Sequence, residues 1–259
     1  MNKEQIDAYR DFAKSKLGFD FNDIDLLITA LTHRSYVNEH KATTHGHNER
    51  LEFLGDAVLE LVSSDFLFKN YDQPEGIMTS WRAALVNTEA NAAAGEKLGY
   101  APLVRLSRGE KNGSDRAHHV IMADCYEAII GAIYLDQGYK AAEKFIYDNS
   151  LIKIDEILET ESWRDSKSYL QELVQRLEGT TPQYIVMKEE GPDHDKTFTL
   201  GVMVNGHLKA TGIGHSKQEA QVKAAGEAIR KYKKERPGDF EIFHSNKSTD
   251  ATVLPKTEK

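Results

Sequence analysis

The sequence predicts two domains of different classes: an all-helical domain over residues 1–160, followed by a small α+β domain over residues 165–235 with the order α-β-β-β-α. Up to about residue 160, apolar residues recur at three- and four-residue spacing, which is typical of helices. Alternation at every second residue, typical of strands, occurs only in the second part. The charge changes as well: residues 1–162 carry 17 basic against 27 acidic side chains, and residues 163–236 carry 13 against 10.

The helical spacing of the first domain falls into four long segments. We expect helices over residues 21–37, 50–71, 78–100 and 121–148. Residues 104–119 lie between the last two segments, and their polar, glycine-containing sequence predicts a loop. Residues 161–164 then read as a linker between the domains.

The second domain opens with a predicted helix over residues 166–179 and a strand over residues 183–191. Two further strands flank Asn205-Gly206, a dipeptide typical of tight hairpins. The last helix follows Ser216, which is spaced from Glu219 as in a capping box. The strand that precedes the hairpin alternates Phe198, Leu200, Val202 and Val204. The tail, residues 236–259, is polar and aperiodic, and we expect it to be mobile.

The composition indicates a cytoplasmic protein. Hydrophobic residues make up 40% of the chain, enough for a sizeable core, and no apolar run approaches membrane-spanning length. The first residues are too charged for a secretory signal. Cys125 is the single cysteine, which excludes an internal disulfide and a thiolate-rich zinc site.

The segment HNERLEFLGDAVLELV, residues 47–62, combines an apolar stripe with a row of acids. At roughly 100° per residue, Glu49, Glu52 and Asp56 share one side, together with Glu60. The opposite side carries Leu51, Leu54, Val58, Leu61 and Val62. One interpretation is an ordinary helix with one buried and one solvated face.

Phe53 weakens that interpretation, because it lies on the charged side, out of reach of its own helix's core. It is either an isolated exposed residue or a plug for a partner's surface. Gly55, beside it, leaves room for another chain to approach closely. A dimer contact next to the carboxylates is therefore a reasonable hypothesis.

A second acidic pair lies in the segment IMADCYEAIIGAIYLD, where Asp124 and Glu127 are three residues apart on one helical face. If the two helices pack together, both pairs of carboxylates converge. Two unit charges at 4 Å repel by about 4 kcal/mol at an effective dielectric near 20. A divalent cation relieves this repulsion, and an all-oxygen ligand set suits Mg²⁺ or Mn²⁺. Hydrolysis of phosphodiesters is the natural chemistry of such a site.

These acidic segments closely resemble the bacterial ribonuclease III family. HNERLEFLGDAVLELV is similar to its signature, and ADCYEAIIGAIYLDQG to its second catalytic segment. LLITALTHRSY and EGIMTSWRAALVN are similar to the flanking helices. The second domain resembles the double-stranded RNA-binding domain that the family carries. The resemblance runs from about residue 5 to residue 235.

The resemblance implies a homodimeric nuclease that cuts both strands of an RNA duplex with Mg²⁺, for which Mn²⁺ would substitute, and without a small-molecule cofactor. The products would be 5′-phosphate and 3′-hydroxyl ends with short 3′ overhangs, and natural substrates would include precursors of ribosomal RNA and other structured transcripts. Whether one or two ions serve each strand stays open.

Site residues follow by position. The implied metal ligands, of which Asp56 and Glu127 are also catalytic, are Glu52, Asp56, Asp124 and Glu127. Glu49 and Glu75 would support the cleavage centre, and Phe53 would fill a socket in the other subunit, whereas Glu60 matches no functional position. The implied RNA contacts are Gln171, Glu172, His194, Ser216 and Lys217.

Two departures from the family pattern concern RNA contacts. The segment SKQEAQVK has Gln218 and Gln221 where the family has lysines, which predicts weaker and less salt-sensitive binding. His118 and His119 replace the usual Arg-x-Ser, and we consider them loop or substrate-contact residues. Two other hypotheses are an inactive RNA-binding scaffold and a phosphohydrolase of small substrates. The complete acidic set argues against the first, and the α-β-β-β-α module argues against the second.

Overall fold

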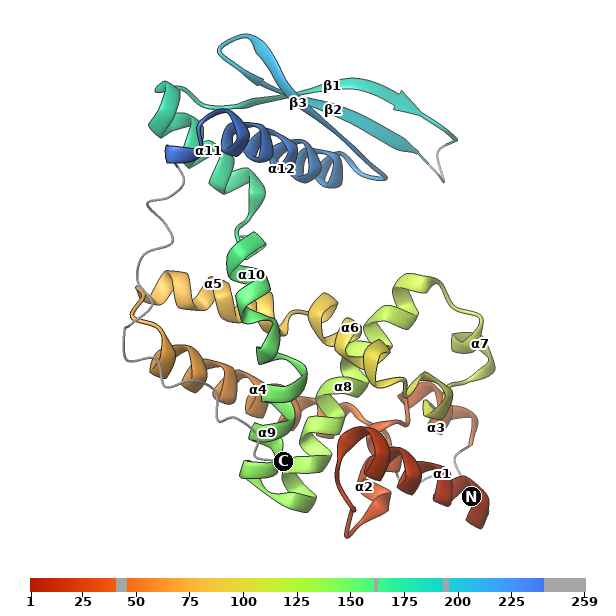
Figure 1. Ribbon diagram of the computed structural model, residues 1–259. Coiled ribbons are helices and arrows are strands. Elements are labelled where there is room, and N and C mark those ends of the chain that lie inside the picture. The colour runs from red at the N-terminus through yellow and green to blue at the C-terminus, as the bar shows by residue number, and fades with distance from the viewer. Residues whose placement is uncertain (41–45, 161–162, 193–195, 240–259) are drawn as a thin grey trace. The chain divides into compact units, whose positions relative to one another are not determined.

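The computed structural model describes residues 1–40, 46–160, 163–192 and 196–239. The chain forms two compact units, one from Met1 to Thr160 and one that begins at Glu161. The first unit is helical and the second is an α+β domain, so the predicted fold class is confirmed (Figure 1). None of the helices in the described ranges is long and apolar enough to cross a membrane.

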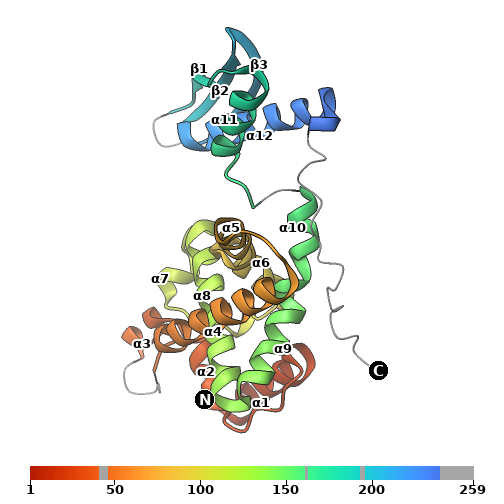
Figure 2. The same ribbon diagram turned by 90° about the vertical axis from the view of Figure 1, so that its left-hand side faces the viewer.

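The first domain consists of helices of very different length. Its elements are α1 (Lys3–Phe12), η1 (Ala13–Leu17), α2 (Ile24–Ala30), α3 (Arg34–Glu39), α4 (Glu49–Asn70), α5 (Glu75–Val86), α6 (Thr88–Leu98), η2 (Ala101–Leu103), α7 (Arg108–Lys111), α8 (Asp115–Gln137), α9 (Tyr139–Asn149), η3 (Leu151–Lys153) and α10 (Ile154–Thr160). The long helix α8 packs against α4, α6, α9 and α2 (Figure 2). Its apolar face is buried as predicted, at Ile121, Ile129, Ile130 and Ile133.

Three of the predicted long helices are each broken into two. Residues 78–100 divide at Asn87, whose side chain accepts a hydrogen bond from the amide of Ala90 and so starts α6. Residues 121–148 divide at Gly138, whose φ of 85° ends α8. Residues 21–37 divide at Thr32, because this segment pairs with Arg105 instead of continuing the helix.

The core face of α4 also differs from the predicted stripe. Leu51, Val58 and Val62 are buried, but Leu61 is 58% exposed and the fully buried Leu59 takes part instead. The buried face is rotated toward Gly55, because α8 packs against the backbone there. The predicted core face was therefore partly wrong.

The second domain has the predicted element order. Its elements are α11 (Ser166–Glu178), β1 (Gln183–Glu190), β2 (Thr197–Val204), β3 (His207–Gly214), α12 (Lys217–Glu235) and η4 (Pro237–Asp239). The strands form an antiparallel sheet of order β1-β2-β3, with the hairpin at Asn205-Gly206, whose φ values of 50° and 78° are left-handed. Residues 161–162 of the predicted linker and residues 240–259 of the predicted tail lie outside the described residues.

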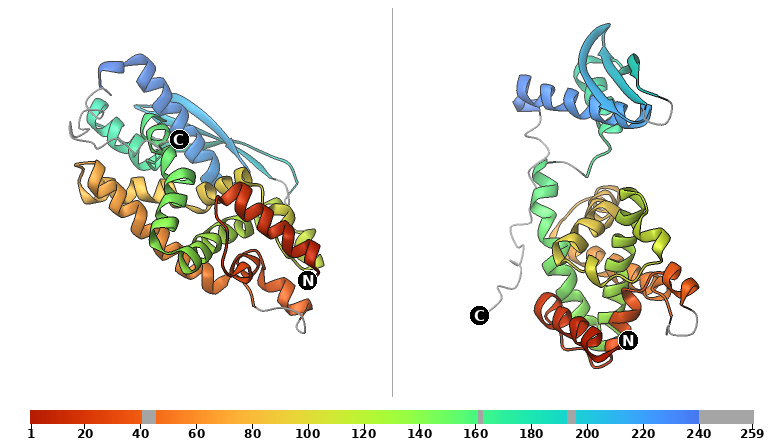
Figure 3. Two further views of the ribbon diagram at one scale, coloured as in Figure 1. Left: turned by 60° about the horizontal axis from the view of Figure 1, so that its bottom comes forward. Right: turned by 90° about the vertical axis from the view of Figure 1, so that its right-hand side faces the viewer.

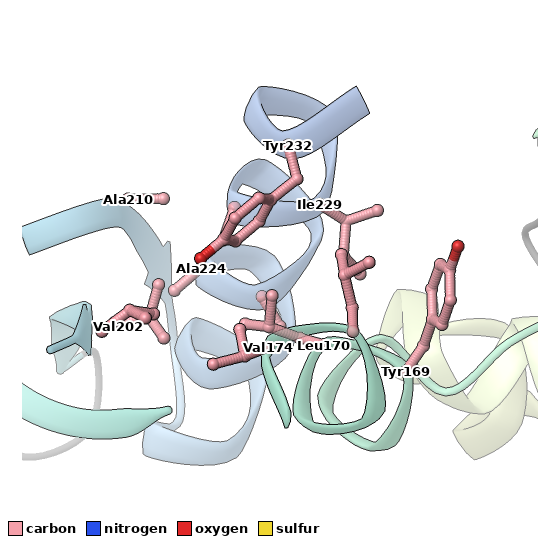
Figure 4. Packing of buried hydrophobic residues seen from close by; sticks show 12 residues of the cluster. Tyr169, Leu170, Val174, Val202, Ala210, Ala224, Ile229 and Tyr232 are labelled. Carbon is pink, nitrogen blue, oxygen red and sulfur yellow. The ribbon is translucent and has the colours of Figure 1, made fainter. Parts of the chain in front are cut away.

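Both helices of the second domain cover one face of its sheet (Figure 3). Val202 of β2 and Ala210 of β3 point toward Ala224 on α12, and Leu170 and Val174 of α11 complete this core (Figure 4). Gly212 allows the close approach, because a Cβ there would lie 2.8 Å from the carbonyl carbon of Lys223. The core thus fixes the solvent-facing sides of α11 and α12.

Candidate active site

The four carboxylates predicted as metal ligands lie on either side of a close crossing between α4 and α8. A Cβ added to Gly55 would lie 2.7 Å from the carbonyl carbon of Glu127 and closer still to its oxygen. A Cβ added to Gly131 would lie 3.1 Å from the carbonyl carbon of Leu51. Only glycines permit such backbone contact. The space at Gly55 is thus filled by α8 of the same chain, and the prediction that it admits another chain was wrong.

This crossing brings the acidic pairs together, because Glu52 and Asp56 flank Gly55, and Glu127 contacts it directly. Burial raises the pKa of Glu127 to about 7, and the charges of Asp56, Glu52 and Asp124 add to the shift. Burial also raises the pKa of Glu52 to about 6, with further contributions from Asp124, Glu49 and Asp56. The two segments therefore share one negatively charged region.

The pKa values of the two aspartates in this region are also raised. Burial raises the pKa of Asp56, with a smaller contribution from the charge of Glu60. Burial also raises the pKa of Asp124, which the nearby His33 partly offsets. The surroundings of these carboxyl groups thus disfavour their ionised form, and a bound cation would favour it.

Glu127 is the most constrained of the four carboxylates. Its Oε1 accepts a hydrogen bond of 2.8 Å from Nδ2 of Asn91 on α6. The same nitrogen donates to the carbonyl oxygen of Val86 at 3.1 Å. Asn91 is 1% exposed. Asn91 was not predicted from the sequence, because an amide within the alanine-rich segment EANAAAG gives no sign of an acceptor on a distant helix.

The donor set of this region fits a hard divalent cation. All four groups are carboxylates, which Mg²⁺ and Mn²⁺ accept as ligands. As the side chains are oriented, no three His, Cys, Asp or Glu residues within the described ranges stand together as an ion-binding group. Repulsion between like charges favours such divergence, and a bound divalent cation would oppose it.

Of the remaining predicted residues of the first domain, Glu49 and Phe53 lie on α4 beside this region, whereas Glu75 lies apart from it. Glu49 precedes Glu52 by one helical turn, and its negative charge contributes to the raised pKa of Glu52. A carboxylate oxygen of Glu49 lies 3.5 Å from the guanidinium of Arg34. Phe53 is 80% exposed, so it is indeed outside the core of its own domain. Glu75 begins α5 and lines a pocket of about 460 Å³ on the second half of α4.

The two histidines of interest are helical, which corrects the prediction of a loop over residues 104–119. α8 already begins at Asp115, because Ser114 caps it. Nε2 of His118 lies 2.6 Å from the carbonyl oxygen of Glu110 and so connects α8 to α7. Nε2 of His119 lies 2.9 Å from a carboxylate oxygen of Glu89 on α6.

In the second domain, the predicted RNA contacts lie on the exposed sides of the two helices. Gln171 and Glu172 are exposed on α11. The hydroxyl of Ser216 accepts a hydrogen bond from the amide of Glu219, and Nζ of Lys217 lies 2.9 Å from the carboxylate of Glu189. The capping box is only half formed, because the Glu219 carboxylate accepts from the amide of His215 instead. His194 lies outside the described residues.

Comparison with known proteins decides the family. Residues 23–154 match the model of the ribonuclease-III-like family, and residues 166–232 match the double-stranded RNA binding motif. The chain belongs to the ribonuclease III family. It is 42% identical to ribonuclease 3 of Desulforamulus reducens over 231 residues, which cover 89% of this chain and 93% of that protein.

Other members of the ribonuclease III family are similarly related. Ribonuclease 3 of Geobacillus kaustophilus is 44% identical over 217 residues, which cover 83% of this chain and 88% of that protein. A solved structure of the ribonuclease III nuclease domain of Campylobacter jejuni is 37% identical, covers 57% of this chain and 98% of that chain, and has a TM-score of 0.48. As a family member, the chain is an endoribonuclease that acts on double-stranded RNA.

Proposed function

We propose that this ribonuclease III-family enzyme hydrolyses phosphodiester bonds on both strands of double-stranded RNA, and that it leaves 5′-phosphate and 3′-hydroxyl ends with short 3′ overhangs. The observation that carries the proposal is the convergence of carboxylates from α4 and α8 at a backbone-to-backbone helix crossing. Ribosomal RNA precursors and other structured transcripts are the proposed substrates, and the cytoplasm is the proposed location.

Glu52, Asp56, Asp124 and Glu127 are the residues that would hold Mg²⁺, with Mn²⁺ as a substitute. When bound, such an ion supplies positive charge for the scissile phosphate and acidifies a water molecule. The chain contributes a rigid arrangement, because the carboxylates project from two helices in direct backbone contact. Asp56 and Glu127 are the proposed catalytic pair, and Glu49 and Glu75 are proposed to support the cleavage centre.

A homodimer is proposed from the surface of the same helix. A side chain as apolar as Phe53 that is 80% exposed beside a charged site indicates a contact with a second subunit. Leu61 and Phe68, which are 58% and 75% exposed, line the pocket on the second half of α4 and offer an apolar surface for it. A twofold-symmetric dimer would present two equivalent sites to opposite RNA strands.

The second domain is proposed to hold the duplex through Gln171, Glu172, Ser216, Lys217 and His194. Two-stranded RNA is bound largely by its shape, through 2′-hydroxyls and phosphates, which suits exposed polar side chains on two helices. Lys217 is paired with Glu189, so phosphate binding would replace one ionic contact with another.

The test is cleavage of a long RNA duplex by wild type and by Glu127→Gln in Mg²⁺, with EDTA and single-stranded RNA as controls. We expect Glu127→Gln to lose cleavage by at least about a hundredfold and to keep duplex binding, because the amide keeps the shape but removes the charge. Glu60→Gln, an exposed residue of α4, is the matched control and should retain activity. Full turnover by Glu127→Gln would refute the ligand role, and RNA binding without cleavage by wild type would support the inactive scaffold.

A further inference from the structure

One hydrogen bond ties a carboxylate of α8 to the interior of α6. The side-chain nitrogen of Asn91 donates both to Oε1 of Glu127 and to the carbonyl oxygen of Val86, at 2.8 and 3.1 Å. The carbonyl oxygen of Val86 can only accept, so the nitrogen end of the amide must face it, and the same nitrogen faces Glu127. The amide thus bridges the acidic region and the backbone of α5.

The oxygen end of this amide lacks a hydrogen-bond partner among the described residues. Oδ1 of Asn91 is buried and makes no hydrogen bond within the described part of the chain. A buried unpaired acceptor lowers stability, and an apolar side chain of the same size would avoid that loss. Asn91 is surrounded in sequence by helix-forming alanines that need no polar neighbour. The fold gains one hydrogen bond, to the carbonyl oxygen of Val86, but carries the unpaired acceptor, whereas Glu127 gains a donor.

We propose that Asn91 is a positioning residue, whose amide holds Oε1 of Glu127 and leaves Oε2 of the same carboxylate for the divalent ion. The inference rests on the proposed role of Glu127 and adds a residue to it. Residues that hydrogen-bond a metal ligand typically change metal affinity or activity by about 10- to 100-fold when replaced. Asn91 should act in this way without touching RNA or the ion.

The experiment uses the full chain with Asn91→Leu, which keeps the number and branching of the non-hydrogen side-chain atoms and removes the donor. Binding of Mn²⁺ alone, without RNA, is measured by calorimetry, and the Mg²⁺ dependence of duplex cleavage is measured separately. We expect about tenfold weaker Mn²⁺ binding and about a tenfold higher half-saturating Mg²⁺ concentration. The rate at saturating Mg²⁺ should change less than the half-saturating concentration.

Two comparisons distinguish the positioning role of Asn91 from a purely structural role in α6. The melting temperature of Asn91→Leu in EDTA should stay close to that of wild type, because the loss of the unpaired acceptor offsets the loss of the hydrogen bonds to Val86 and Glu127. Asn87→Ala, which removes the cap of the same helix but does not contact Glu127, should melt earlier and bind Mn²⁺ normally. If leucine prevents folding, Asn91→Ala provides the same test.

The outcomes separate this inference from the proposed function. Wild-type Mn²⁺ affinity and Mg²⁺ dependence in a folded Asn91→Leu would overturn the positioning role, even with Glu127→Gln inactive. An active Glu127→Gln would instead overturn the proposed function. Weaker ion binding in Asn87→Ala as well would show that loosening α6 is sufficient, which also contradicts the inference.

Discussion

The crossing at Gly55 allows the sharpest test of how the fold builds the site. In Gly55→Ala the new Cβ would lie 2.7 Å from the carbonyl carbon of Glu127, whereas ordinary contacts begin at 3.4 Å. The helices must therefore separate by more than about 0.7 Å, because the carbonyl oxygen of Glu127 would lie closer still and backbone cannot rotate away. Overpacking of this kind typically costs about 1–3 kcal/mol, against about 1 kcal/mol gained in helix propensity.

The effect on catalysis should be larger than the effect on stability. A shift approaching 1 Å in the position of catalytic groups can lower a rate by about a hundredfold. We therefore expect Gly55→Ala to remain mostly folded at 25 °C and to cleave duplex RNA roughly 10- to 100-fold more slowly. Urea unfolding followed by circular dichroism measures the stability, and initial rates of duplex cleavage measure the loss of catalysis.

Gly226 provides the matched control, because it also lies within a helix but has room for a Cβ, with Oγ of Ser166 nearest at 3.9 Å. Gly226→Ala should leave stability unchanged or raise it by up to about 1 kcal/mol. If Gly55→Ala were as stable and as active as wild type, the helices could separate freely, and the argument that their contact sets the carboxylate positions would be wrong.

Three further predictions concern charge and assembly. In EDTA, the first domain should lose stability as the pH rises from about 4.5 towards 7, because the pKa of Glu127 is raised from 4.5 to about 7 in the folded state, which therefore keeps a proton that the unfolded chain releases. Melting temperatures measured across this pH range should fall, and Mg²⁺ should reduce the fall. The same fall in Glu127→Gln would contradict the assignment. Phe53→Ala should weaken the proposed dimer by about 2 kcal/mol or more without affecting folding. Leu135→Ala, a substitution of another exposed residue, should leave the dimer unchanged. A sedimentation profile of Phe53→Ala identical to that of wild type would argue against the proposed dimer contact. Lys217→Ala should lower the slope of log affinity for duplex RNA against log salt by about 1, and a slope equal to that of wild type would mean that this lysine meets no phosphate.

Most of the fold could be predicted from sequence because periodicity reports which face of a segment is buried. The breaks at Asn87, Gly138 and Thr32 were not predicted, since the apolar spacing runs on through all three. Whether a helix stops there depends on its hydrogen-bond partners, and for Thr32 the partner is Arg105, far along the chain. Periodicity contains no information about such a partner.

In the candidate site, too, some residues could be predicted from the sequence and others could not. Glu127 was identifiable because an acid within an apolar helical segment is unusual. Asn91 was not, since an amide in an alanine-rich helix is unremarkable until its distant acceptor is known. Gly55 was noticed for the right reason, its lack of a side chain, but the sequence could not say which backbone would approach it.

The helix crossing also affects how the enzyme is made. Its acidic groups come from two stretches far apart in the chain, so a growing polypeptide on the ribosome contains the first pair long before the second has been synthesised. Until α8 has emerged and settled against α4, no complete acidic group exists. On the proposed assignment, a nascent chain therefore lacks half of its metal ligands until α8 has folded against α4.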